Sequence, residues 1–310
     1  MTAATPSVAP RPTQRPPTGG SSTGLAIGAL LLVLSLGSIW AVNRQIEAYF
    51  SELDATNLNQ ATETFEALVN QQRVRLLTYV QILVDDTRIR TTAMTTGFDE
   101  GTIRDILEDL KKASNVNVLA VLDENGKVRA ITGAEGLRQV DLSASPVIKA
   151  AQEKPASYFW TLPDQVLIIG VAPIRTGPRV SALLLMGTTL GAPELSAIER
   201  TLGVHGAIFN GDRSIARSST DASLVDVFRS ADAAGDAGPS PVPGHPDFMT
   251  RLTRTNDSAT AAKVVWLVQR QRMSKEAHML RVAVWIPAIF ATATFGLIFF
   301  IQRKRKGGVS

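Results

Sequence analysis

The side chains best suited to catalysis are few and scattered. Gly20-Ser-Ser-Thr-Gly24 matches the G-x-S-x-G pattern of a hydrolase nucleophile, but no strand precedes it and a long apolar segment follows. The histidines, His205, His245 and His278, have no neighbouring His, Asp or Glu at metal-ligand spacing. The sequence carries no phosphate-binding, dinucleotide-binding, zinc or kinase motif. We therefore predict that the protein is not an enzyme and uses no cofactor or metal.

A small-molecule binding site is the better expectation. Ligand pockets combine apolar walls with a few polar groups that fix the orientation of the ligand. Tyr158 and Trp160 are two residues apart in a predicted strand, so their side chains share one face, and Asp164 follows at the next turn. The alternative is that the two aromatic side chains only complete a hydrophobic core.

These residues belong to a predicted antiparallel sheet. VLAVLDENGKVRAITG, residues 118–133, predicts a hairpin whose turn contains Gly126, a residue free to adopt positive φ. Both faces of its first strand are apolar, which is typical of a central strand. The sequence predicts helices at 102–113 and 145–154 and three further strands at 157–162, 165–174 and 179–189. We expect a sheet with helices packed on one side.

A long helix precedes this sheet. Apolar residues recur every three or four positions over residues 46–83, and neither Pro nor Gly occurs in residues 42–96. This pattern predicts one helix of about 50 residues. Asn57 and Gln72 fill gaps in the apolar stripe. Two interpretations remain open: the helix packs along its own domain, or the stripe forms the seam of a homodimer.

The order of long helix, hairpin, short helix and three-stranded meander is that of PAS-like folds. NVNVLAVLDENGKVRAITG and SYFWTLPDQVLIIGVAPIRTGPRVSALLLMGTTL carry the likeness, and residues 46–190 resemble a Cache domain, an extracytoplasmic ligand-sensing module of bacterial receptors. A weaker second copy begins at Pro193 and includes the strand–turn–strand VHGAIFNGDRSIARSS and the late strand KVVWLVQR. The Gly- and Pro-rich residues 232–246 are expected to form a long loop.

Two uncharged segments flank the predicted modules. Gly24–Val42 and Val282–Ile301 contain no charge over 19 and 20 residues. A helix of that length can cross a hydrocarbon layer of about 30 Å. The alternative for the first is a cleaved signal peptide, and for the second a buried core helix. The tail before the first segment and the tail after the second each contain Lys or Arg and no Asp or Glu. This charge pattern predicts that both termini are cytoplasmic. We thus expect a two-pass protein of the bacterial inner membrane, with a periplasmic body.

The predicted class is α+β, with PAS-like antiparallel sheets arranged as a double Cache, a long N-terminal helix and two flanking transmembrane helices. The expected organisation is a disordered tail, a first span, a membrane-distal module with the long helix, a membrane-proximal module, a second span and a basic tail, at residues 1–23, 24–43, 44–190, 191–275, 282–301 and 302–310.

The resemblance also implies a site. In Cache receptors for amino acids and small carboxylates, the ligand lies between the sheet and a loop-helix segment, where aromatic and acidic groups hold an amine and an arginine holds the carboxylate. The resemblance implies that Arg129, Tyr158, Trp160 and Asp164 bind a small molecule such as an amino acid or organic acid. The full amino-acid-binding motif of these receptors is not recognisable here, so the resemblance does not fix the ligand.

Composition and length limit the classes of partner that the protein can have. The net charge of +4 is too small to indicate nucleic acid, and the absence of Cys excludes a disulfide framework. Because the sequence holds nine residues after Ile301, we expect the signal to pass through the spans to a separate signalling protein. The alternatives are a non-enzymatic accessory or scaffold protein with a degenerate Cache fold and an anchored periplasmic enzyme. A polar cavity near Trp160 would favour the sensor, and an apolar plug there would favour the scaffold.

Overall fold

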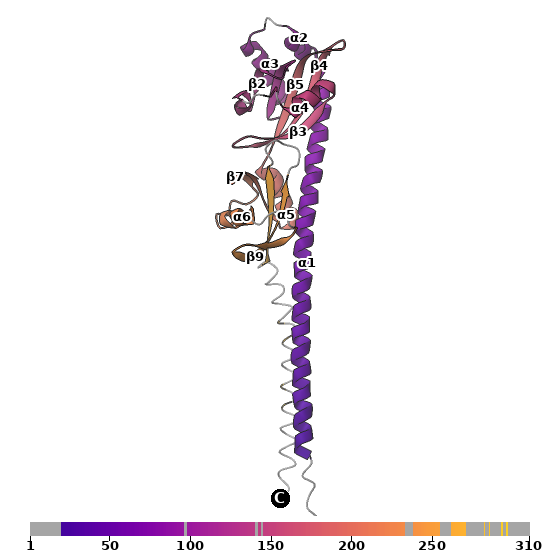
Figure 1. Cartoon of the computed structure of the whole chain (residues 1–310), viewed down its shortest axis with the longest axis vertical. Coiled ribbons are helices and arrows are strands. Elements are labelled where there is room, and N and C mark those ends of the chain that lie inside the picture. The colour runs from indigo at the N-terminus through magenta and orange to yellow at the C-terminus, as the bar shows by residue number, and fades with distance from the viewer. Residues whose placement is uncertain are drawn as a thin grey trace, which may run out of the picture. The chain divides into compact units, whose positions relative to one another are not determined.

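The computed structural model describes residues 20–95, 98–139, 142–143, 145–232, 238–254 and 262–270, and positions 282, 285, 293 and 296 (Figure 1). The chain divides into two compact units, one made of Met1–Phe50 with Ser274–Ser310 and the other of Ser51–Met273. Both sheets lie in the second unit, together with the later part of the first helix.

The longest element is helix α1, Gly20–Val84, which begins before the predicted boundary at Gly24. Helix α1 ends at Val84, and a second helix, α2, begins after Asp86 and covers Thr87–Met94. The carboxylate of Asp86 accepts a hydrogen bond of 2.8 Å from the backbone N–H of Arg88. The predicted long helix is therefore present, and the structure adds a second helix start that the sequence analysis did not predict, where Asp86 caps a free backbone N–H group.

The first sheet has five antiparallel strands in the order β2-β1-β5-β4-β3. Its strands are β1 Val118–Asp123, β2 Val128–Thr132, β3 Ala156–Thr161, β4 Val166–Thr176 and β5 Arg179–Leu190. In the β1–β2 turn, Asp123 accepts hydrogen bonds from the backbone N–H groups of Asn125 and Lys127 at 2.9 and 2.8 Å, and Gly126 adopts a φ of +86°. The predicted hairpin thus forms for the predicted reason.

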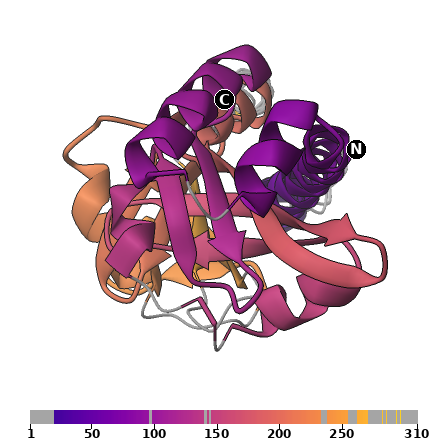
Figure 2. The same cartoon turned by 90° about the horizontal axis from the view of Figure 1, so that it is seen from above.

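Helices cover both faces of the first sheet (Figure 2). Helices α1, α2 and α3, Glu100–Ser114, pack on one face, and η1, Glu135–Gln139, and α4, Pro146–Glu153, pack on the other. The prediction of helices on one side only is wrong. Residues 166–174 of β4 are all buried, as expected of a strand that is covered on both faces.

The second sheet repeats the topology of the first, with strand order β7-β6-β10-β9-β8. Its elements are α5 Ala192–Leu202, β6 His205–Asn210, β7 Arg213–Arg217, α6 Leu224–Asp232, β8 Ser240–Val242, β9 His245–Arg254 and β10 Lys263–Gln269. We call Ser51–Leu190 the first module and Ala192–Gln269 the second module. The predicted α+β class, with a long N-terminal helix and two antiparallel sheets, is confirmed.

The predicted loop over residues 232–246 is wrong from Ser240 onward. There, β8 pairs with β9 through a turn in which Gly244 has a φ of +76°. Pro241 is tolerated because β8 is the edge strand of the sheet, where a missing N–H removes no central ladder bond. His245, expected in a solvated loop, opens β9.

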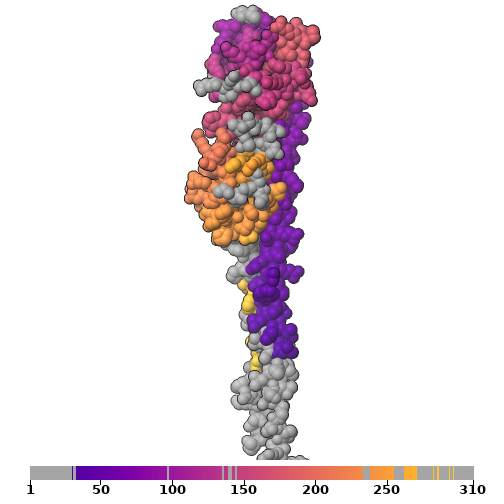
Figure 3. Space-filling model, viewed as in Figure 1, coloured from indigo at the N-terminus to yellow at the C-terminus, as the bar shows by residue number. Residues whose placement is uncertain are grey.

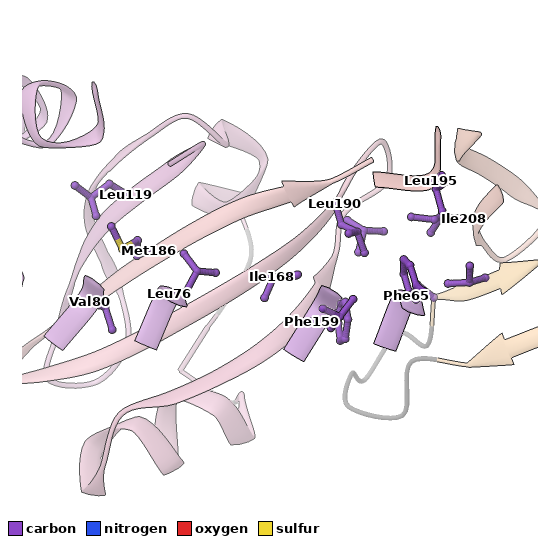
Figure 4. Packing of buried hydrophobic residues seen from close by; sticks show 14 of the residues in the cluster. Phe65, Leu76, Val80, Leu119, Phe159, Ile168, Met186, Leu190, Leu195 and Ile208 are labelled. Atoms are coloured by element: carbon purple, nitrogen blue, oxygen red, sulfur yellow. The ribbon is translucent and has the colours of Figure 1, made fainter. Parts of the chain in front are cut away.

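One hydrophobic cluster joins α1 to both sheets (Figure 4). It includes Phe65, Leu76 and Val80 of α1, together with strand residues of the first and the second sheet. Phe65 meets Trp266 of β10 edge to face, with 5.6 Å between ring centroids. In the space-filling view α1 lies along both modules (Figure 3). Over this stretch the helix therefore packs along its own domain, as the first of the two interpretations predicted.

In the part of the chain that the structure describes, no helix combines the length and the hydropathy that a membrane crossing requires. The predicted tail up to residue 19, nearly all of the predicted second span and the basic tail lie outside the described residues. Both spans stay predictions.

Candidate ligand-binding site

Two of the predicted site residues lie together on β3. Tyr158 and Trp160 are half-buried and pack against the hydrophobic cluster on the α4 face, whereas Phe159 between them joins the cluster on the α1 face. The aromatic pair therefore shares one face of the sheet, as its spacing predicted.

Apolar side chains fill the space on that face. Leu137 of η1, Leu142 of the segment before α4 and Ile148 of α4 are at most 1% exposed, and they pack against inward-facing residues of β1, β4 and β5. Tyr158 and Trp160 lie at the edge of this cluster. This packing is what the alternative left open by the sequence expects, and ligand binding by these two residues stays a prediction.

Arg129 points to the opposite side. Its guanidinium donates hydrogen bonds to the backbone carbonyl oxygens of Ala93, at 2.6 Å, and Thr95, at 3.1 Å, at the end of α2. Helix α2 packs on the α1 face of the sheet. The structure therefore does not bring Arg129 together with Tyr158 and Trp160.

Asp164 is exposed in the turn between β3 and β4 and lines a different space. This space, which we call the junction cavity, has a volume of about 530 Å³ and lies where the two modules meet. The start of β4 and the end of β5 contribute walls from the first module, and the start of α5, β7 and the chain after it contribute walls from the second. Of the four predicted residues, Asp164 alone lines this cavity.

The junction cavity also contains residues that the sequence reasoning did not nominate. Ser214 and Arg217 reach it from β7, Thr189 from β5 and Ser219 from the chain after β7. The sequence showed β7 only as the return strand of a weak repeat, and no local pattern links it to Asp164. The pairing of these segments is a product of tertiary structure.

A second cavity of about 530 Å³ lies within the second unit. Asn57 of α1, His205, Glu199 and Asp221 supply polar groups, and Phe248 is part of the apolar wall. Nδ1 of His205 lies 2.9 Å from Oε1 of Glu199, an ion-pair distance without hydrogen-bond geometry.

Hydrogen bonds from Ser223 and, to a lesser extent, the nearby His205 lower the pKa of Asp221, so this carboxylate is ionised at neutral pH. Over the residues described, His, Asp and Glu form no cluster of three or more with metal-binding geometry.

Residues 90–208 match the model of the CHASE4 domain. The matched part begins in α2, contains α3, the first sheet and α5, and ends within β6. The resemblance to an extracytoplasmic sensor domain that the sequence predicted is thus confirmed over this part of the chain. A search of curated proteins finds no match.

Among solved structures, the chain is similar to sensory domains. The sensory domain of the Campylobacter jejuni chemoreceptor Tlp3 is 11% identical, with 74% of this chain and 97% of that chain covered and a TM-score of 0.47. A domain of a putative sensory box/GGDEF family protein from Vibrio parahaemolyticus is 11% identical, with 72% and 98% covered and a TM-score of 0.44. The sensor domain of the V. cholerae histidine kinase DctB is 11% identical, with 73% and 98% covered and a TM-score of 0.42.

Proposed function

We propose, from the premise that residues 90–208 form a CHASE4 sensory domain, that the protein is a bacterial inner-membrane sensor. Its two-module body lies outside the cytoplasm and binds a small molecule. Binding changes the position or mobility of α1, and a separate signalling protein reads that change. The observation that carries the proposal is the single hydrophobic core that α1 forms with both sheets.

Apolar contacts support the role of α1. Phe65 and Leu76 are at most 3% exposed, and each packs on a different sheet. At Gly170 of β4, an added Cβ would lie 3.4 Å from the backbone carbon of Leu76, so helix and strand approach closely. Close-packed interiors transmit displacements because they contain little free volume. A rearrangement of either sheet must therefore be accommodated at α1.

Polar contacts fix the register of α1 against each sheet. The guanidinium of Arg73 donates to the backbone carbonyl of Ser157 at 3.4 Å and lies 5.3 Å from the centre of the Phe159 ring. Further along the helix, the hydroxyls of Thr62 and Thr253 are 3.3 Å apart. These directional contacts distinguish one position of α1 from a slid or rotated one.

The continuity of α1 supports signalling toward the membrane. The predicted first span, residues 24–43, and the segment that packs on the sheets belong to one helix. A helix transmits a displacement along its axis because every backbone hydrogen bond is internal to it. The membrane topology and the separate partner are parts of this proposal, and they rest on the uncharged segments and flanking cations of the sequence.

The test uses the full chain in detergent micelles. The protein has no Cys, so Val74→Cys on exposed α1 and Asp212→Cys in the β6–β7 turn accept two spin labels without background. A panel of amino acids and organic acids is first screened by thermal shift, since a ligand of the folded state raises its apparent stability. We expect a stabilising compound that also shifts the label-to-label distance. A panel without any hit, or a hit that leaves the distance unchanged, would refute the proposal.

A specific observation favours a second function. The α4 face of the first sheet is filled by apolar side chains, as expected of an accessory or scaffold protein that no longer binds a ligand there. Under this alternative the thermal-shift panel gives no hit, and variants of the junction cavity behave as the parent does.

A further inference from the structure

The junction cavity contains a buried cationic nitrogen without a partner. Arg217, on edge strand β7, lines the cavity, and its Nη1 is buried and makes no hydrogen bond. The guanidinium carries its charge at every physiological pH and has only donors to offer. Native structures contain few buried polar groups without a hydrogen-bond partner. The cost in folding free energy is greatest when the group without a partner is charged. The arrangement indicates that an anion belongs beside Arg217.

Among the described residues, no acidic side chain forms an ion pair or hydrogen bond with Nη1 of Arg217. Asp164 lines the same cavity, but within the described chain no ion pair joins it to Arg217. The carboxylate of Glu194, near the start of α5, accepts a hydrogen bond of 2.9 Å from the backbone N–H of Gly191. It is thereby committed to the capping box of its own helix. Nη1 of Arg217 is therefore left without a direct anionic partner in the described part of the chain.

The other walls suit a carboxylate. Thr189, Ser214 and Ser219 bring hydroxyl groups that can donate hydrogen bonds to an oxyanion. Ala192, the first residue of α5, also lines the cavity, and the start of a helix carries a partial positive charge that favours anions. Leu190 adds apolar surface for a carbon skeleton.

Asp164 limits the charge of the ligand. Asp164 lines the same cavity, so its negative charge would disfavour a second anionic group on the ligand. A molecule with one carboxylate satisfies Arg217 without that repulsion. The volume of about 530 Å³ lies in the range of small-molecule sites.

We propose that the junction cavity is a binding site for a small organic monocarboxylate, whose carboxylate pairs with Arg217. This inference deepens the proposed function, on which its role in signalling rests, while binding itself is measured independently. The site draws its walls from both modules, so its ligand contacts the first and the second module at once.

The experiment is isothermal titration of the full chain in detergent micelles with acetate, propionate and butyrate as probes. Propionamide, which lacks the charge, and succinate, which carries two carboxylates, are the comparison compounds. We expect at least one monocarboxylate to bind, and propionamide and succinate to bind more weakly. If none of the three monocarboxylates binds, the proposal is overturned.

Matched variants locate the site. Arg217→Gln should weaken monocarboxylate binding by about tenfold to a hundredfold, the usual effect of losing charge-assisted hydrogen bonds. Arg213→Gln, on the exposed start of the same strand, should bind as the parent does. Asp164→Asn should strengthen succinate binding. Equal affinity in Arg217→Gln and the parent would overturn the assignment of the carboxylate to Arg217. Unchanged succinate binding in Asp164→Asn would overturn the preference for a single charge.

Failure of folding and failure of the proposed function are both distinguishable from failure of this site. The melting temperature of Arg217→Gln without ligand should equal or exceed that of the parent, because a buried guanidinium nitrogen without a hydrogen-bond partner is removed. If monocarboxylates bind through Arg217 but the spin-label distance between α1 and the β6–β7 turn does not change, the site stands and the sensing function fails.

Discussion

Truncation of Phe65 tests whether α1 and the two sheets share one core. The side chain is 2% exposed and meets the ring of Trp266 in the second sheet, within a cluster that also contains first-sheet residues. Phe-to-Ala substitutions in cores cost about 3–5 kcal/mol, because burial is lost and a cavity remains. We expect Phe65→Ala to reduce the free energy of unfolding by this amount.

Hydrogen exchange measured by mass spectrometry reports the stability of each module separately. Amides of the central strands β5 and β10 exchange through large-scale opening, so their protection reports on each sheet separately. A loss of about 3–5 kcal/mol accelerates exchange by about a hundredfold to several thousandfold. With a shared core, peptides from both strands should accelerate by similar factors.

The matched control is Phe228→Ala. Phe228 is 1% exposed but belongs to the cluster on the α6 face of the second sheet, away from the cluster that contains α1. This variant should accelerate exchange in β10 more than in β5. If Phe65→Ala exposes β10 and leaves β5 as protected as in the parent, the two modules have separate cores, and the reasoning behind the proposed function is wrong.

Four further predictions concern stability and are measured as shifts of the urea midpoint. Burial raises the pKa of Asp54 above its ordinary 3.8, against a smaller opposing effect of a nearby arginine. The folded protein therefore loses stability as the pH rises from 3.8 through the raised pKa, and Asp54→Asn should flatten this decline. Gly206→Ala should cost about 1–3 kcal/mol, because the added Cβ would lie 2.5 Å from a ring carbon of Trp266. Gly101→Ala in α3, where the added Cβ makes only a 3.7 Å contact, should instead gain up to about 1 kcal/mol. Arg129→Met should cost about 1 kcal/mol through two lost hydrogen bonds to the end of α2, and should leave the thermal-shift response to ligands unchanged.

The elements with strong local signals were predictable. The β1–β2 hairpin could be predicted because a polar turn with Gly126 separates two apolar runs, and the observed strands differ from the predicted ones by only a few residues. The apolar stripe of α1 identified Phe65, Leu76 and Val80, all of which are buried. Periodicity of this kind survives folding because it is the pattern that burial itself requires.

Features decided by tertiary context were not predictable. The β8–β9 hairpin looks like a loop because Gly and Pro dominate it, and only its position at the edge of a sheet makes Pro241 acceptable in a strand. The start of α2 at Thr87 was not predicted, because no Pro or Gly in residues 42–96 marks the end of α1. Arg217 and Asp164 are more than fifty residues apart, and no spacing rule brings them to one cavity.

The energetics of the two faces explain why the ligand site should lie at the junction of the modules. Making room beside Trp160 would displace buried side chains such as Leu137, Leu142 and Ile148, each of which contributes about 1.5–3 kcal/mol through burial. Three such side chains amount to about 5–9 kcal/mol, comparable with the entire binding free energy of a micromolar ligand, about 8 kcal/mol. The junction cavity requires no such loss, and an anion there also relieves the unpaired charge of Arg217. A ligand shifts a conformational equilibrium only by its difference in affinity for the two states. A site walled by both modules provides that difference whenever the modules move relative to each other, so this cavity is better placed than the filled face to convert binding into a displacement of α1.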